Sequence, residues 1–330
     1  MNNSIHVLIL FGPTASGKTA VLKNVFNFSG LKTEVISADS MQVYRGMDIG
    51  TAKPSAEERA ILPHHLIDIR DPSEQFNAGD FVRLADKACL QIAQRGSLPV
   101  ISGGTGFYLK NFILGLSEAP PSDQEIRMRL KLDLKEKGIA ALMEELAICD
   151  PVSAGRIHIN DEYRLLRALE VYRSCGRPLS SFEVNSAICR SDAACADKIR
   201  ADYRFTIIGL SRPREELYRR INLRCARMFE QGLAAEVRSL FEAGFTPNDP
   251  GMRAIGYREF FVESEEAQDK WRLSEDLDGV QALVAQNSRR YAKRQITFFA
   301  KIPGVKWIEC GNDDEETAEM VKREIHEARI

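Results

Sequence analysis

Residues 5–19, IHVLILFGPTASGKT, join a short apolar run to a glycine-containing loop. The run from Ile5 to Phe11 is short, apolar and partly β-branched, which predicts a buried parallel strand. Gly12 and Gly17 allow the backbone to surround an anion with N–H groups. A helix predicted from Lys18 to Asn27 would point its positive N-terminal end at the same place. The stretch therefore predicts a polyphosphate site at the start of an α/β fold.

The loop has the spacing of phosphate-binding loops. Lys18 supplies a mobile cation for the outer phosphates, and the hydroxyl of Thr19 can reach a bound Mg²⁺. A glycine-containing surface turn is the alternative, which the strand before the loop and the helix after it disfavour. The loop alone identifies neither the phosphate compound nor the reaction. The residues expected to contact phosphate are Gly12, Pro13, Thr14, Ala15, Ser16, Gly17, Lys18 and Thr19.

Length and composition are those of a soluble globular protein. The chain has 330 residues, enough for one large α/β domain with a substantial insertion or second lobe. It is 44% hydrophobic and 28% charged, and no run approaches the roughly 20 apolar residues of a membrane helix. A secretory signal is not expected, because its removal would take away the strand before the loop. We expect a cytoplasmic protein without a membrane partner.

The cysteines and histidines do not form a recognisable metal motif. The seven cysteines include no C-x-x-C pair, which predicts reduced thiols, mostly in the core, and argues against a zinc site. His64 and His65 are the only adjacent histidines, and we interpret them as part of a structural turn after Pro63. The cysteines are Cys89, Cys149, Cys175, Cys189, Cys195, Cys225 and Cys310.

The distribution of charge is more informative than its sum. The formal net charge of −2 does not by itself suggest a nucleic-acid partner. Residues 286–301 nevertheless hold five basic residues and no acidic one, whereas residues 313–316 read DDEE. An acidic tail can therefore mask a basic working face in the total.

The remaining strand-like runs alternate with helical stretches, which predicts a P-loop NTPase-like parallel sheet flanked by helices. A helix from Glu215 to Gln231 follows the last of them. The runs are Glu34 to Ala38, Leu66 to Ile69, Pro99 to Ser102 and Tyr203 to Leu210.

The alternation is interrupted after residues 120–123, PPSD, by a charged stretch of helical period from Gln124 to about Cys195. We therefore expect a catalytic core formed by residues 1–120 and 201–330. A helical lobe, residues 121–200, would be inserted between them.

Asp39 follows directly on the second predicted strand. Ligands of such sheets bind at the carboxyl ends of the strands, so Asp39 is expected beside the phosphate loop. Its carboxylate could hold Mg²⁺, act as a general base, or cap the next turn with Ser40. Residue type alone favours the cap.

Seven motifs resemble the tRNA dimethylallyltransferase (tRNA isopentenyltransferase) family along nearly the whole chain. The first is shared by many NTPases, whereas the ordered set is specific. The zinc-finger extension of some eukaryotic relatives is missing, so the resemblance is to the bacterial type. The motifs are GPTASGKT at 12–19, DSMQVYRGMDIGTAKP at 39–54, HHLIDI at 64–69, GGTGFYLK at 103–110, RALEVY at 167–172, RAIGYRE at 253–259 and YAKRQITFF at 291–299.

The resemblance implies transfer of a dimethylallyl group from dimethylallyl diphosphate to the N6 amine of the adenosine 3′-adjacent to the anticodon of tRNA. The products would be N6-(dimethylallyl)adenosine and diphosphate, so the loop would hold a leaving group. Lys18, Thr19 with Mg²⁺, and Arg224 would neutralise the diphosphate, and Asp39 would be the general base. Arg224 shares a predicted helix with Arg220 and Arg227, and without the resemblance it would be interpreted as solvated surface.

The resemblance also implies a set of residues that face tRNA. The basic residues of 289–294 would fall on one side of a helix, and the alternative is an exposed amphipathic face anchored by Phe298 and Phe299. Ala300 stands where many relatives have arginine, so a backbone contact would be lost or replaced by Lys301. The implied residues are Asp39, Ser40, Met41, Gln42, Thr105, Arg127, Tyr163, Arg164, Leu165, Leu166, Arg167, Arg253, Ala254, Ile255, Gly256, Tyr257, Arg258, Lys293, Arg294 and Gln295.

Two other functions remain compatible with the residues. In a small-molecule P-loop kinase, ATP would occupy the loop and Asp39 would activate an acceptor hydroxyl. In a non-catalytic P-loop protein, the basic residues would bind RNA without chemistry. The sequence shows no heptad repeat or obvious apolar patch, so a monomer is expected.

Overall fold

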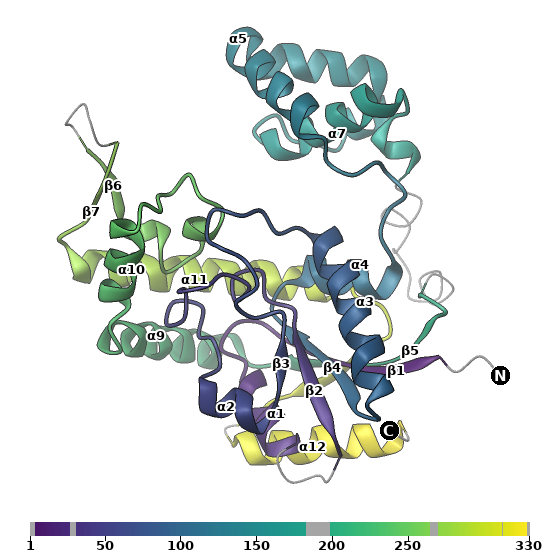
Figure 1. The fold of residues 1–330 in the computed structure, drawn as a ribbon, viewed down its shortest axis with the longest axis vertical. Coiled ribbons are helices and arrows are strands. Elements are labelled where there is room, and N and C mark those ends of the chain that lie inside the picture. Colours follow the sequence, from purple (N-terminus) through teal and green to yellow (C-terminus); the bar gives the residue numbers. More distant parts are fainter. Residues whose placement is uncertain (1–3, 27–30, 183–198, 265–269, 312, 329–330) are drawn as a thin grey trace. The chain divides into compact units, whose positions relative to one another are not determined.

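The computed structural model describes residues 4–26, 31–182, 199–264, 270–311 and 313–328 (Figure 1). The chain divides into two compact units. The sheet unit comprises Met1–Ile113 and Arg200–Ile330, and the helical unit comprises Leu114–Ile199.

A six-stranded sheet forms the centre of the sheet unit. Its order is β3-β2-β4-β1-β5-β8, and every pair of neighbours is parallel. This arrangement confirms the predicted parallel sheet flanked by helices. The strands are β1 (Ile5–Phe11), β2 (Thr33–Ser37), β3 (His64–His65), β4 (Leu98–Gly103), β5 (Tyr203–Ser211) and β8 (Lys306–Glu309).

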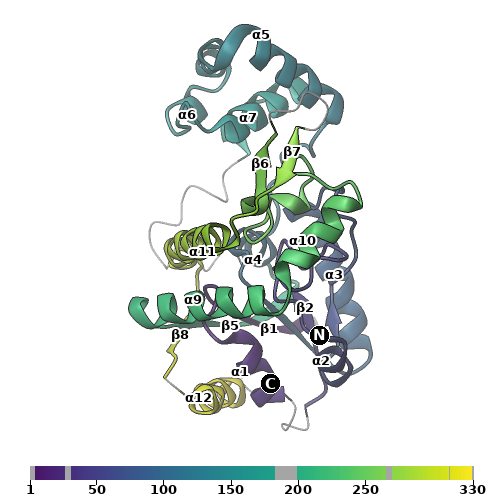
Figure 2. The same ribbon diagram turned by 90° about the vertical axis from the view of Figure 1, so that its left-hand side faces the viewer.

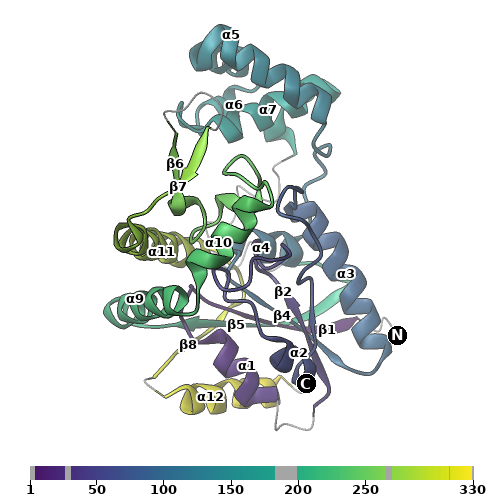
Figure 3. The same cartoon turned by 60° about the vertical axis from the view of Figure 1, so that its left-hand side comes forward.

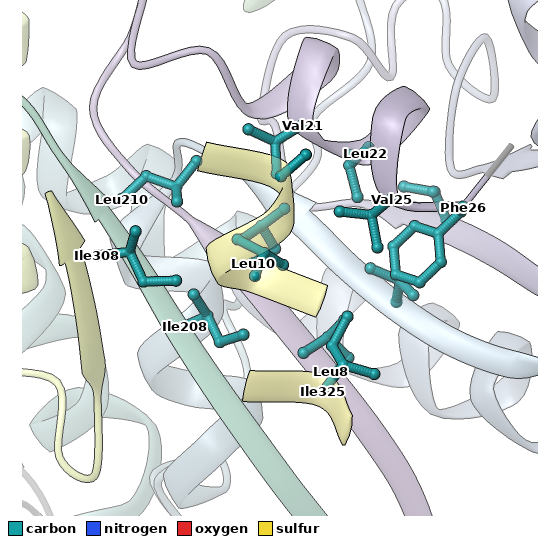
Figure 4. Close-up of a cluster of buried hydrophobic side chains, with 14 of the residues drawn as sticks. Leu8, Leu10, Val21, Leu22, Val25, Phe26, Ile208, Leu210, Ile308 and Ile325 are labelled. Carbon is teal, nitrogen blue, oxygen red and sulfur yellow. The ribbon is translucent and has the colours of Figure 1, made fainter. Parts of the chain in front are cut away.

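Both faces of β1 are buried, which explains its continuous apolar sequence. Leu8 and Leu10 belong to a core between the sheet and two helices, α1 (Lys18–Phe26) and α12 (Asp314–Glu327) (Figure 4). The ring of Phe11 instead contacts Phe299 of α11 (Leu277–Phe299), with ring centroids 4.8 Å apart. The predicted strand has the observed bounds because alternate side chains find apolar partners on both faces.

The remaining helices of the sheet unit connect the strands in the sequence and flank the sheet in space. Figures 2 and 3 show α9 (Arg214–Glu230) next to α11, which it contacts. Asn77 and Asp80 form a capping box at the start of α3, which supplies partners for two backbone N–H groups. These helices are α2 (Ala56–Ile61), α3 (Ala78–Gln94), α4 (Gly106–Leu114), α9 (Arg214–Glu230) and α10 (Leu233–Glu242).

One predicted strand is wrong. Residues Leu66 to Ile69 do not form a strand, because β3 ends at His65 and Leu66 and Asp68 have φ of 63° and 57°. Left-handed backbone of this kind cannot continue a strand. The segment is a turn whose Asp68 carboxylate pairs with Lys53 at 2.6 Å and Arg59 at 2.9 Å.

Four strands were not predicted from the sequence. One is β3, because His64 and His65 pair with β2 and do not form the structural turn expected after Pro63. The others are β8 and a separate antiparallel pair, β6 (Phe261–Glu263) with β7 (Trp271–Leu273). The interpretation of residues 313–316 as an acidic tail is also wrong. Asp313 caps α12 and Asp314 pairs with Arg212 at 2.8 Å, so these carboxylates lie in the first helical turn, where acidic residues are stabilising.

The helical unit has its own core. Leu130, Leu142, Leu146, Leu165 and Leu169 are all buried there. Its described elements are α5 (Gln124–Cys149), which bends at Gly138, α6 (Pro151–Ala154), α7 (Glu162–Cys175) and the short turn Leu179–Ser181. The rest of the stretch expected to be helical, with Cys189 and Cys195, lies outside the described residues, as does Asn27.

A buried carboxylate organises the start of the helical unit. Glu170 accepts hydrogen bonds from the hydroxyl of Ser122 at 2.6 Å and the backbone N–H of Asp123 at 2.7 Å. It also pairs with Arg127 and Arg167, each at 3.1 Å. Within the described parts of both units, we find no helix long and apolar enough to cross a membrane.

Candidate active site

The candidate site lies at the carboxyl ends of three neighbouring strands. The order β2-β4-β1 places the turn after β4 between the segments that follow β2 and β1. Asp39 follows β2, Gly104 and Thr105 follow β4, and the phosphate loop follows β1. This edge is where ligands bind in parallel sheets.

The loop glycines serve two different purposes. Gly17 has a φ of 102°, a conformation that favours glycine. Gly12 instead lies so close to its neighbours that a Cβ would be 2.7 Å from the Ser16 hydroxyl and 2.8 Å from the carbonyl oxygen of Leu210. The loop also holds Ala15 at a φ of 63°, which is uncommon for a residue other than glycine.

Lys18 is folded back onto the loop. Its ammonium donates hydrogen bonds to the carbonyl oxygens of Gly12 and Pro13, both at 2.9 Å. Burial, together with the nearby charge of Arg224, lowers the pKa of Lys18 to about 8, and Asp39 opposes this shift. Lys18 is therefore mostly charged at neutral pH, but its charged form is less favourable here than on an exposed lysine. Thr19 lies exposed in the first turn of α1.

Arg224 reaches the loop from α9. Its Nη1 donates a hydrogen bond to the Thr14 hydroxyl at 3.0 Å, so it is not the solvated surface residue that the sequence alone suggested. Burial lowers its pKa, and the charge of Asp39 opposes this shift. Arg220 also reaches the loop and donates from Nε to the carbonyl oxygen of Ala15 at 3.2 Å, whereas Arg227 is exposed.

Asp39 has both a local and a longer-range interaction. Its Oδ1 accepts a hydrogen bond from the N–H of Met41 at 2.9 Å, as expected of a residue that caps a turn. Its charge also acts on Lys18, Arg224 and the Tyr291 phenol. Burial first, and then Asp39, raise the pKa of Tyr291 to about 12, so this phenol stays protonated at neutral pH. Capping thus leaves the carboxylate electrostatically coupled to the phosphate loop.

The segment after Asp39 is held by side-chain hydrogen bonds. The Gln42 carbonyl accepts from the Ser37 hydroxyl at 2.9 Å, and its amide donates to the carbonyl oxygens of Thr51 and Ala52 at 3.3 and 3.2 Å. The Thr105 hydroxyl accepts from the Ser40 N–H at 3.0 Å. The turns after β2 and β4 are therefore fixed to one another.

Sequence reasoning missed two residues that support this edge. Arg212, whose side chain is fully buried, donates from Nε to the carbonyl oxygen of Ser16 at 2.9 Å and from Nη2 to Asp314 at 2.8 Å. It therefore holds the phosphate loop from the side of α12. No spacing in the sequence marks it, because its contact with the loop spans 196 positions.

The second missed residue is Glu236 of α10. Its carboxylate accepts hydrogen bonds from the N–H groups of Asp48 at 2.9 Å, Ile49 at 2.8 Å and Gly50 at 3.2 Å, and from the Tyr257 hydroxyl at 2.6 Å. It therefore joins two motifs of the family resemblance, residues 39–54 and 253–259. Glycine at position 50 was the only local signal, since a Cβ there would be 2.4 Å from the Tyr257 ring.

The residues expected to face tRNA differ in exposure. Six have little or no exposed side chain, because they pack in the cores of their units: Leu165, Leu166, Ala254, Gly256, Tyr257 and Gln295. Those with exposed side chains are Tyr163, Arg164, Arg253, Arg258, Lys293 and Arg294. The intermediate ones are Asp39, Ser40, Met41, Gln42, Thr105, Arg127, Arg167 and Ile255.

Some of the accessible side chains already have partners. Arg253 donates to the carbonyl oxygens of Pro247 and Asn248, and the guanidinium of Arg127 lies 4.8 Å from the centre of the Tyr163 ring. At the end of α11, Phe299 is buried as expected of an anchor and Phe298 is half-buried, whereas Ala300 and Lys301, which follow the helix, are both exposed.

Comparisons with known proteins identify relatives of the whole chain. Residues 42–302 match the family model for IPP transferase. The chain is 44% identical to a tRNA dimethylallyltransferase of Geobacter sulfurreducens, over 92% of this chain and 91% of that one. It is 41% identical to tRNA dimethylallyltransferase 1 of Syntrophotalea carbinolica, over 98% and 96%.

Two solved structures are also similar. A full-length tRNA isopentenylpyrophosphate transferase from Bacillus halodurans has a TM-score of 0.64 and 36% identity, covering 98% of both chains. A eukaryotic dimethylallyltransferase acting on tRNA has a TM-score of 0.76 and 26% identity, covering 98% of this chain and 78% of that one.

Proposed function

Because this chain belongs to the IPP transferase family, we propose that it transfers a dimethylallyl group from dimethylallyl diphosphate to tRNA. It is a transferase enzyme of the tRNA dimethylallyltransferase class. The acceptor is the N6 amine of the adenosine 3′-adjacent to the anticodon, and the second product is diphosphate. One observation carries the proposal: Lys18 and Arg224 converge on the phosphate loop, and the Asp39 carboxylate is electrostatically coupled to both.

The phosphate loop would hold the leaving group. An allylic diphosphate ionises readily once its negative charge is neutralised, so the main requirement is a set of cations and N–H donors around it. The loop N–H groups, Lys18 and Arg224 meet this requirement. Lys18 need only turn from the carbonyl oxygens of Gly12 and Pro13 toward the diphosphate.

Asp39 would accept the proton of the acceptor amine. The lone pair of an exocyclic adenine amine is delocalised into the ring, so removing a proton as the N–C bond forms assists attack. The hydrogen bond from Met41 orients Oδ1 and leaves the second carboxylate oxygen for the amine. Thr105, through Ser40, would keep this turn in place.

A divalent metal ion fits the loop as a companion of the diphosphate. Among the residues that the structure describes, we find no cluster of three or more His, Cys, Asp and Glu side chains that could hold a metal. Mg²⁺ needs no such cluster, because it commonly keeps several waters and is bound through substrate phosphates. We propose that the exposed Thr19 hydroxyl is its protein ligand and that Mg²⁺ supplies charge neutralisation.

The exposed basic residues would bind tRNA. Lys293 and Arg294 of α11, with Arg253 and Arg258, present cations that suit a phosphate backbone. In the helical unit, Arg164 and Tyr163 are exposed, and we propose that this unit contributes to tRNA binding. The target base would leave its stack to reach Asp39, as chemistry on a base generally requires.

Labelling distinguishes this reaction from its rivals. Purified protein is incubated with radiolabelled dimethylallyl diphosphate and unmodified tRNA, beside a reaction with ATP and small acceptors. We expect label in tRNA and none when the target adenosine is replaced by guanosine. Phosphate transfer from ATP without labelled tRNA would support the kinase, which the comparisons do not favour, and tRNA binding without transfer would support the non-catalytic protein.

We also propose that the protein acts as a monomer in the cytoplasm. The sequence has no heptad repeat and no obvious apolar patch that would drive self-association. We propose the cytoplasm because the protein would act where its proposed substrate, tRNA, is found. Light scattering of the purified protein tests the first point by giving its mass in solution.

A further inference from the structure

Gln295 of α11 connects two parts of the site that belong to different strands. Its Oε1 accepts a hydrogen bond from the N–H of Thr14 at 2.8 Å, and its Nε2 donates to the carbonyl oxygen of Gly104 at 2.7 Å. The side chain is 5% exposed, so it is not available to a partner in solution. Both ends of the amide are therefore used inside the protein.

Each of these contacts leads to a group with a proposed chemical role. Thr14 accepts a hydrogen bond from Arg224 on the side of the diphosphate. Gly104 is followed by Thr105, which holds the N–H of Ser40 next to Asp39. Gln295 thus completes a continuous connection between the proposed leaving-group site and the proposed base.

The packing around Gln295 fixes its position. A Cβ at Gly104 would lie 2.6 Å from Nε2 of Gln295, so this close approach needs glycine. One helical turn earlier, the Tyr291 hydroxyl lies 3.4 Å from the same carbonyl oxygen of Gly104, and one turn later Phe299 packs on Phe11. The amide therefore sits on a rigid helix face pressed against the turn after β4.

We propose that Gln295 is a positioning residue for the transfer reaction, which sets the phosphate loop at the correct distance from Asp39. This inference rests on the proposed function. It replaces the expectation that the Gln295 side chain contacts tRNA. The neighbouring Lys293 and Arg294 are exposed and remain the tRNA-facing residues of this helix.

The test separates catalysis from tRNA binding. Gln295→Met keeps the length of the side chain, but it removes the partner of the Thr14 N–H and leaves the Gly104 carbonyl with only the longer hydrogen bond from Tyr291. We expect kcat at saturating tRNA to fall about tenfold or more, because a small displacement of the reacting groups slows the chemical step. The Kd for tRNA should stay within about twofold of the wild-type value, because this buried amide would make no contact with RNA.

A second variant and a control guard against a general loss of structure. Gln295→Glu keeps the acceptor for Thr14 but loses the donor to Gly104. Amide hydrogen exchange at Thr14 should therefore become faster in Gln295→Met and change less in Gln295→Glu. Gln286→Met, at an exposed position of the same helix, should leave kcat, the Kd and exchange unchanged.

Two results would overturn the inference. A weaker tRNA Kd with unchanged kcat would make Gln295 a tRNA contact, and unchanged Thr14 exchange in Gln295→Met would deny the bridge itself. If wild-type protein transfers no label, the proposed function fails, whereas the exchange experiment still decides whether Gln295 holds the loop.

Discussion

The guanidinium of Arg224 donates a hydrogen bond to the hydroxyl of Thr14 at 3.0 Å, across 210 positions of sequence. The contact brings α9 onto the phosphate loop and places a half-buried positive charge beside it. Arg224→Lys removes the planar, multiply donating group and keeps a charge of the same sign. We expect the affinity for inorganic diphosphate, measured by calorimetry, to fall about tenfold, as for loss of a hydrogen bond to a charged group. Arg227→Lys, at an exposed site of the same helix, should bind diphosphate like the wild type.

Asp39→Asn tests the proposed base. Asparagine can still accept the Met41 N–H, so the turn should be retained, but it cannot take a proton. We expect kcat for tRNA labelling to fall by about 10²–10⁴, the usual contribution of a general base, with a tRNA Kd within about twofold. Asp71→Asn, which makes the same charge change at a half-exposed surface ion pair, is the control. Normal turnover in Asp39→Asn would exclude a base at this position.

Diphosphate affinity should depend on pH through Lys18. Its pKa of about 8 is lowered by burial, and a bound diphosphate would raise it again. Binding then takes up a proton wherever free Lys18 is neutral, so affinity is complete below about pH 8 and is lost as pH rises through that value. The loss should approach about tenfold per pH unit in metal-free calorimetry. Lys18→Arg stays charged, so its profile should be flatter, and parallel profiles would refute this assignment.

Gly50→Ala tests the close approach of two motifs. The added Cβ would lie 2.4 Å from the Tyr257 ring, which is buried and cannot move aside freely. Overpacking of this kind costs about 1–3 kcal/mol, and we expect that loss in the free energy of unfolding measured in urea. Gly155→Ala, whose nearest contact would be 3.5 Å, should change stability little. Equal free energies of unfolding for the two variants would contradict the close contact between Gly50 and the Tyr257 ring.

Glu236→Gln tests the carboxylate that holds residues 48–50. An amide can accept through only one oxygen, so its NH₂ group would face backbone N–H groups or the Tyr257 hydroxyl. We expect faster amide exchange at residues 48–50 and a free energy of unfolding lower by about 1–3 kcal/mol. Glu242→Gln, at an exposed position of the same helix, is the matched control. Unchanged exchange at residues 48–50 would show that the turn is stable without Glu236.

The parts of the fold that could be predicted are those encoded locally. β1 has the predicted bounds because an apolar run needs no knowledge of its partners to be identified as a buried strand. β3 and β8 have only two and four residues, and β8, Lys306–Glu309, is charged at both ends. These strands exist because they pair with β2 and β5, which no local pattern reveals.

The same distinction applies to the site. The loop residues and Asp39 could be assigned from motifs, whereas Glu236 and Arg212 bind backbone groups 187 and 196 positions away in the sequence. Gln295 lies in a motif, but the motif does not say which way its side chain points. Burial against Gly104 decides that, and burial is a property of the packed structure.

The backbone N–H of Arg200 donates to the carbonyl oxygen of Ile113 at 3.0 Å, so the chain leaves the sheet unit and returns to it at adjoining points. A tight turn would be long enough to join Ile113 to Arg200 directly, in place of the whole helical unit. The helical unit is therefore a single insertion between two adjoining points of the sheet unit. Lengthening or exchanging this insertion would add little to the entropic cost of bringing its two ends together. The tRNA contacts proposed for this unit could therefore change without altering the sheet edge that carries the phosphate loop.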